Sequence, residues 1–126
     1  MRAADTDLLV RLLARDDPQQ VIAVEDFIES GAWVSHLVLV EAIWVLKSLY
    51  GRDRRETIMA VEMLLKHTSL VLQDPDTVDA ALAHFRAAHA PEFSDCLILE
   101  LARKHGHLPL GTFDRRLSKL PGARRV

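Results

Sequence analysis

The longest apolar segment of the chain contains a single acid. Between residues 34 and 46 the only formally charged side chain is that of Glu41. A helix over residues 37–49 would surround this carboxylate with apolar side chains, and a helix that is apolar all round belongs in a protein interior. There a lone carboxylate pairs with a cation, accepts hydrogen bonds or takes up a proton. The pattern therefore predicts either an ion pair at the rim of the core or a metal or catalytic site.

Short apolar runs alternate with longer segments of helical period along the rest of the chain. Strands that alternate with helices indicate an α/β fold whose parallel sheet is covered on both faces. The expected strands are residues 2–5, 32–35, 69–72, 107–110 and 123–126. The expected helices lie around residues 8–13, 18–30, 37–50, 55–66, 76–88, 96–104 and 115–119.

Several polar residues and prolines are expected to mark element boundaries. Asp5 or Asp7 is placed to cap the first helix, and Asp76 is placed to cap the helix after the third strand. Pro18 stands in the first turn of its helix, where proline is favoured. Pro109 confines the fourth strand candidate to weak pairing or to a strand start.

Composition fits one globular domain spanning residues 1–126. The chain is 49% hydrophobic and 27% charged, which is typical of a folded soluble protein. No apolar run reaches the roughly 20 residues that a membrane helix needs, and the first residues lack the pattern of a secretory signal. We therefore expect a cytoplasmic protein with no membrane partner.

The cysteine, histidine and charge content limits which kinds of site and partner are possible. The single Cys96 excludes an internal disulfide and a cysteine-rich zinc site, and the six histidines are scattered. The net charge of −2 gives no overall attraction to nucleic acid. The segment from Arg115 to Arg125 nevertheless contains several cations and no acid. Such a run is either a solvated surface or a track for phosphates, and both interpretations remain open.

Four acids are expected to converge at one edge of the sheet. In parallel sheets, ligand sites form beyond the carboxyl ends of the strands. Asp5 follows the first strand, and Glu41 lies in the helix after the second. Asp114 follows the fourth strand with Thr112 beside it, and Asp95 opens the helix that precedes this strand.

Clustered carboxylates repel one another, and a divalent cation relieves the repulsion. Oxygen ligands alone favour Mg²⁺ or Mn²⁺ over zinc or copper. One such ion, or two roughly 4 Å apart, supports hydrolysis of a phosphodiester. Each acid taken singly also has an ordinary interpretation as a helix cap, a surface charge or an ion-pair partner.

The order of these motifs resembles the PIN-domain ribonucleases. The matching segments, in order, are Asp5-Thr6-Asp7, Glu41 in the helix after the second strand, Phe93-Ser94-Asp95 and Thr112-Phe113-Asp114. The size and layout of the chain look like those of the VapC toxins of bacterial toxin–antitoxin pairs. The resemblance covers the whole chain and implies a three-layer α/β/α domain with a short central parallel sheet of four to five strands.

The resemblance also implies an activity and its partners. It implies an endoribonuclease that uses Mg²⁺ or Mn²⁺, forms homodimers and is neutralised by a VapB-type antitoxin in a hetero-oligomer. Asp5, Asp95 and Asp114 would be the metal ligands, Glu41 a further acid of the cluster, and Thr112 a hydroxyl that hydrogen-bonds within it. The apolar helix around Trp44 would supply part of the surface for a protein partner.

One position departs from the family pattern, because Asp7 stands where the family usually has Asn. This supports an alternative, a catalytically weak or inactive PIN-like domain that binds RNA or a protein. A phosphoacceptor receiver domain with Asp74 as acceptor is a third interpretation. It lacks the expected Lys after a late strand and leaves Glu41 and Asp95 unexplained. Glu92 is placed to assist the cluster or to lie on the surface.

Overall fold

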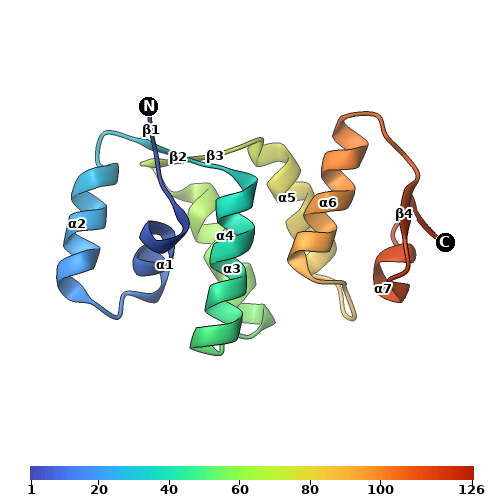
Figure 1. Cartoon of the computed structure of the whole chain (residues 1–126), viewed down its shortest axis with the longest axis horizontal. Helices are drawn as coiled ribbons and strands as arrows, with labels where there is room; N and C mark the ends of the chain where they lie inside the picture. Colours follow the sequence, from blue (N-terminus) through green and yellow to red (C-terminus); the bar gives the residue numbers. More distant parts are fainter. The chain divides into compact units, whose positions relative to one another are not determined.

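The computed structural model describes residues 1–126 and divides them into two units, Met1–Gln73 and Asp74–Val126 (Figure 1). All the strand pairs in both units are parallel, as the alternating pattern predicts. None of the helices is both long enough and apolar enough to cross a membrane.

The first unit contains a three-stranded sheet with β2 in the middle, between β1 and β3. Along β2 and β3 the outer residues are buried and the central residue is exposed, which is the two-residue period of a strand. The strands are β1 (Arg2–Ala3), β2 (Ala32–Val34) and β3 (Leu70–Leu72). The helices are α1 (Thr6–Ala14), α2 (Pro18–Ile28), α3 (His36–Tyr50) and α4 (Arg54–Lys66).

Every helix of the first unit begins with a side-chain cap. Asp5 caps α1, which confirms one of the two expected candidates, and Asp7 lies in the first turn. Ser35 connects β2 directly to α3 and accepts a hydrogen bond from the Val38 amide. Such caps replace the backbone acceptors that the first turn of a helix lacks. The remaining caps are Asp17 for α2 and Asp53 for α4, the latter in a capping box with Glu56.

Helix α3 is buried on one side only, so the expectation of a helix buried all round is wrong. Leu39, Ala42 and Leu46 are buried, on the side that packs against α1. Leu37 and Trp44 are 69% and 66% exposed. The sequence could not separate the two faces, because both are apolar.

The second unit packs α5 (Pro75–Phe85) against α6 (Phe93–Lys104). The rings of Phe85 and Phe93 meet edge to face, with centroids 5.8 Å apart. A parallel pair, β4 (Leu110–Thr112) and β5 (Ala123–Arg125), flanks the short helix α7 (Arg115–Ser118). The buried core side chains of α5 and α6 include Val78, Ala81, Leu82, Cys96, Leu97 and Leu99.

Two boundary predictions in the second unit are corrected. The fourth strand occupies Leu110–Thr112 rather than residues 107–110. Pro109 has no N–H to donate, so regular pairing begins after it, where the Leu110 amide donates to the Gly122 carbonyl at 2.8 Å. Asp76 does not cap α5, because the N-cap residue is Asp74. The Asp76 carboxylate instead pairs with the Lys104 ammonium at 3.2 Å.

We expect substitutions at two adjacent positions of α6 to differ sharply in their effect on stability. Leu99 is fully buried and Ile98 is 49% exposed. Leu99→Ala should lower the free energy of unfolding by about 2–5 kcal/mol, because it leaves a cavity in the core. The control Ile98→Ala should cost about 1 kcal/mol or less. Equal losses in urea denaturation would contradict the burial of Leu99.

Candidate functional site

Asp5 leaves β1 and begins α1. One oxygen, Oδ1, accepts a hydrogen bond from the Leu8 amide at 3.2 Å, and the other oxygen makes none. The next side chain, Thr6, donates its hydroxyl to Oε2 of Glu41 at 2.9 Å. Thr6, the residue after Asp5, therefore connects α1 to Glu41 of α3, and the sequence did not assign this threonine to the site.

Glu41 lies on the exposed stripe of α3, one turn from Leu37 and Trp44. No cationic side chain of its unit pairs with it, and Oε1 makes no hydrogen bond. The ion pair considered for this carboxylate is thus not formed within the first unit. Its flanks are apolar, as predicted, but they are exposed to solvent.

Asp114 has the same place after a strand as Asp5. It follows β4 and caps α7, accepting a hydrogen bond from the Leu117 amide at 2.8 Å through Oδ1. Its own N–H donates to Oγ1 of Thr112 at 3.0 Å. The Thr112 hydroxyl therefore contacts the backbone of Asp114 rather than a carboxylate.

Asp95 is the third residue of α6 and is partly buried. Burial raises the pKa of its carboxyl, and the negative charges of Asp114 and Glu92 raise it further. The second unit therefore brings two predicted site acids close enough to repel each other, with Glu92 contributing to the same negative field.

The model of one protein family, the PIN domain, matches residues 3–123. The chain belongs to the PIN domain family. PIN domains are generally metal-dependent nucleases, so the match supports nuclease activity and confirms the α/β fold expected from the sequence. Comparisons with curated proteins and with solved structures find no match.

The acids of this PIN domain have the donor chemistry of a magnesium site. Each keeps at least one carboxylate oxygen without a hydrogen bond: Asp5, Glu41, Asp95 and Asp114. Within either unit, no three His, Cys, Asp or Glu side chains are grouped as metal ligands. The second unit brings Asp95 and Asp114 close enough to repel each other, and Mg²⁺ is usually held by one or two carboxylates with water and phosphate completing its shell.

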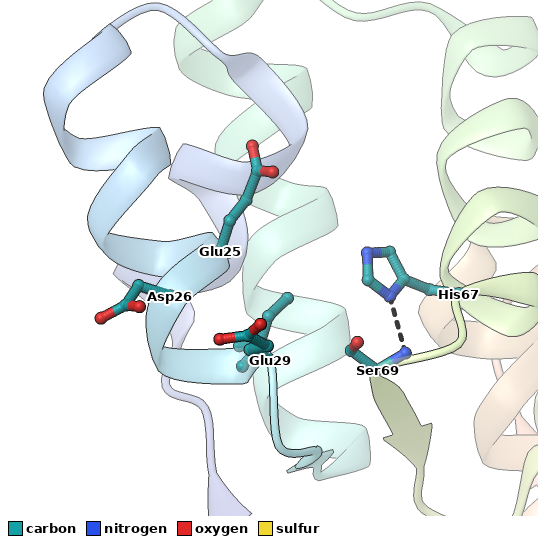
Figure 2. Close-up of a pocket in the computed structure, with 6 residues that line it drawn as sticks. Glu25, Asp26, Glu29, His67 and Ser69 are labelled. Carbon is teal, nitrogen blue, oxygen red and sulfur yellow. Dashed lines mark hydrogen bonds between the residues drawn. The ribbon is translucent and has the colours of Figure 1, made fainter.

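The first unit also has a cavity of about 390 Å³ that contains none of these acids. Figure 2 shows the carboxylates of Asp26 and Glu29 directed away from His67, and the Glu25 side chain extending to a different place from both. The Nδ1 atom of His67 accepts a hydrogen bond from the Ser69 amide at 3.1 Å. Glu25 pairs with Arg15 at 2.9 Å. These side chains do not converge on a common point, and no three of them are grouped as metal ligands.

A buried acid in the second unit was missed by the sequence analysis. Glu100 is 8% exposed. Its Oε2 lies 3.1 Å from Nε2 of His84 and 3.2 Å from Nε of Arg103. The signal was present, since Glu100 is a lone acid in the apolar run of α6.

We expect Asp95→Asn to stabilise the protein at pH 7 in the presence of a chelator. Folding raises the pKa of this carboxyl above its ordinary 3.8, so the contribution of Asp95 to stability is most favourable below pH 3.8 and is lost as the pH rises through the raised value. An amide carries no such charge. The melting temperature of the variant should exceed that of the parent at pH 7, and the difference should vanish in acid.

Asp76→Asn is the matched control, with the opposite sign. A hydrogen bond from Lys104 lowers the pKa of the Asp76 carboxyl, so its charge favours folding above the ordinary pKa. Replacing it should not raise the melting temperature at pH 7. An equal rise in both variants would show a general effect of lost negative charge rather than the local repulsion at Asp95.

Proposed function

We propose that this PIN domain is an endoribonuclease that depends on Mg²⁺ or Mn²⁺. Asp5, Asp95 and Asp114 would hold the metal, with Glu41 as a further acid of the site. The observation that carries the proposal is the PIN-domain match over residues 3–123. The partly buried position of Asp95 beside Asp114 and Glu92 supports it, because burial and these charges raise the pKa of the Asp95 carboxyl. A divalent cation relieves such repulsion and stabilises the ionised form of the carboxyls over the protonated form.

Residues 1–126 would act as one domain, with Asp5 and Glu41 coming from Met1–Gln73 and Asp95 and Asp114 from Asp74–Val126. The family match runs from residue 3 to residue 123 and so includes all four acids. When bound, the metal would supply activation of a water and charge compensation at the phosphate. The protein's own contribution would be orientation, because helix capping by Asp5 and Asp114 fixes one oxygen and leaves the other for the ligand.

Removal of either of two acids should abolish RNA cleavage. Asp5→Asn retains an amide oxygen that can cap α1, and Asp95→Asn leaves the fold intact, but both remove a charge from the proposed metal site. We expect losses beyond the about 10–100-fold typical of residues that only support metal ligands. Cleavage of a labelled RNA in Mg²⁺ measures this. Asp26→Asn, an exposed acid outside the site, is the control.

Full activity in Asp5→Asn or Asp95→Asn would refute the proposed site.

Asp7 supports a second candidate, an inactive domain that binds RNA or protein. In the structure Asp7 is exposed in the first turn of α1. A negative charge there also stabilises the helix by interacting with the positive end of its dipole. Calorimetric titration with Mg²⁺ separates the two candidates, since an inactive site should bind no metal near physiological concentration.

We further propose a VapC-type toxin, with a homodimer and a VapB-type antitoxin as partners. Large exposed apolar side chains on α3 and α4 support a protein-binding surface, because apolar side chains exposed in number often belong to interaction sites. They are Leu37 (69% exposed), Trp44 (66%), Leu49 (75%), Met59 (58%) and Met63 (39%). Sequencing of RNA ends after expression without the antitoxin would identify the cleaved RNA and its site.

Trp44→Lys should weaken protein assembly without reducing cleavage. A large exposed aromatic side chain is a typical centre of binding energy, and its loss commonly costs tenfold or more in affinity. Sedimentation of the purified chain and co-purification with the antitoxin measure this. Lys47→Ala, on an exposed polar position of the same helix, is the control. Unchanged assembly in Trp44→Lys would remove this face from the interface.

A further inference from the structure

The second unit contains a cavity of about 330 Å³ between the α5–α6 connection and α7. In Figure 1, α7 is drawn in red, and the α5–α6 connection lies between the yellow and the orange helix. The cavity combines small apolar residues with two imidazoles and two cations. Its lining is His84, Ala87, Ala88, His89, Ala90, Pro91, Arg116, Lys119 and Leu120.

We propose that this cavity binds one nucleotide of an RNA strand, with the phosphate held by Arg116 and Lys119. The inference rests on the proposed function, because it assigns the cavity to the strand that the acids would cleave. The cavity would be a nucleotide-binding subsite whose residues differ from the proposed metal ligands.

The cations of the cavity are available to a phosphate. Neither the Arg116 guanidinium nor the Lys119 ammonium forms a hydrogen bond or an ion pair, and both residues are exposed. Arg115, their neighbour on the same helix, does not line the cavity. The structure therefore separates two members of the basic run from the rest, which the sequence alone did not.

The remaining lining suits a nucleoside. Ala88, Pro91 and Leu120 form an apolar surface, and imidazole rings such as those of His84 and His89 are among the side chains that stack on unpaired bases. The volume of about 330 Å³ lies at the lower end of the range for small-ligand pockets. An acidic peptide would need the cations but has no comparable use for the imidazoles.

His89 has a backbone conformation that favours glycine. Its φ is +62°, and it stands within a turn closed by a hydrogen bond from the Ala90 amide to the Ala87 carbonyl at 3.3 Å. This conformation is strained for a residue that has a Cβ atom. Glycine adopts this conformation without strain, so His89→Gly removes the imidazole from the cavity without disturbing the turn.

The cavity is also built on the segments that carry the second unit's acids. Pro91 lines it and directly precedes Glu92, which begins α6 and its acid Asp95. Arg116 lies two residues after Asp114, on the helix that Asp114 caps. A nucleotide in the cavity would therefore be a close neighbour, along the strand, of the phosphate at the acids.

Binding of RNA in a chelator tests the assignment without cleavage. The probe is a fluorescein-labelled six-nucleotide RNA, measured by anisotropy at several salt concentrations. Arg116→Gln with Lys119→Gln should weaken binding and reduce the slope of log affinity against log salt by about 1.4, the value for two lost single-strand contacts. Arg115→Gln with Arg124→Gln removes the same charge outside the cavity and should leave the slope nearly unchanged.

His89→Gly provides a test with two readouts of opposite sign. It should weaken binding of the six-nucleotide RNA severalfold while leaving the melting temperature equal to or above that of the parent. A purely structural role for His89 would instead lower the melting temperature and leave RNA binding unchanged. Amide shifts at residues 84–91 and 116–120 should follow titration with adenosine 5′-monophosphate more strongly than titration with inorganic phosphate.

Equal loss of binding in the two double variants would overturn the proposal in favour of diffuse surface charge. Unchanged binding in the Arg116 and Lys119 variant, or a preference for an acidic peptide over RNA, would overturn it as well. Selective loss supports it. Selective binding loss together with an absence of cleavage in Mg²⁺ would refute the nuclease proposal and leave the nucleotide cavity standing.

Discussion

Helix capping is the constraint that ties the candidate chemistry to the fold. Asp5 and Asp114 each follow a strand, and each uses one oxygen to accept a hydrogen bond from the first turn of the next helix. The cap fixes the carboxylate in space, and the oxygen that remains has no partner within its unit. An aspartate that caps a helix and offers its second oxygen to a ligand is oriented by the cap itself. A domain of 126 residues therefore needs no further element to hold it.

The strands and helices were largely predictable because local signals agree with the final structure. Two-residue alternation marks β2 and β3, and caps such as Asp5 and Asp53 mark where helices begin. The misplaced fourth strand and the wrong cap at Asp76 have different reasons. Pro109 has no N–H to donate, so regular pairing starts only at Leu110. The Asp76 carboxylate is paired with Lys104 of another helix, a tertiary contact that the local sequence does not predict.

Glu41 and Glu100 show what a sequence pattern leaves undecided. Each is a lone acid in an apolar helical run, and the pattern predicts burial with a compensating partner. Glu100 fulfils it, being 8% exposed between His84 and Arg103. Glu41 does not, because α3 buries only the face toward α1. Whether an apolar face is covered depends on tertiary packing, and one-dimensional periodicity does not contain that information.

A net charge of −2 and a set of repelling acids make the distribution of cations decisive for any RNA-binding role. A polyanion approaches carboxylates only where nearby cations offset their field, and exposed charges act over about one Debye length, roughly 8–10 Å. In the second unit the cations directly follow Asp114 in the chain, on α7 and beyond it. Sequence order thus sets acid and cation side by side, and the turn of a short helix decides which cations face the cavity.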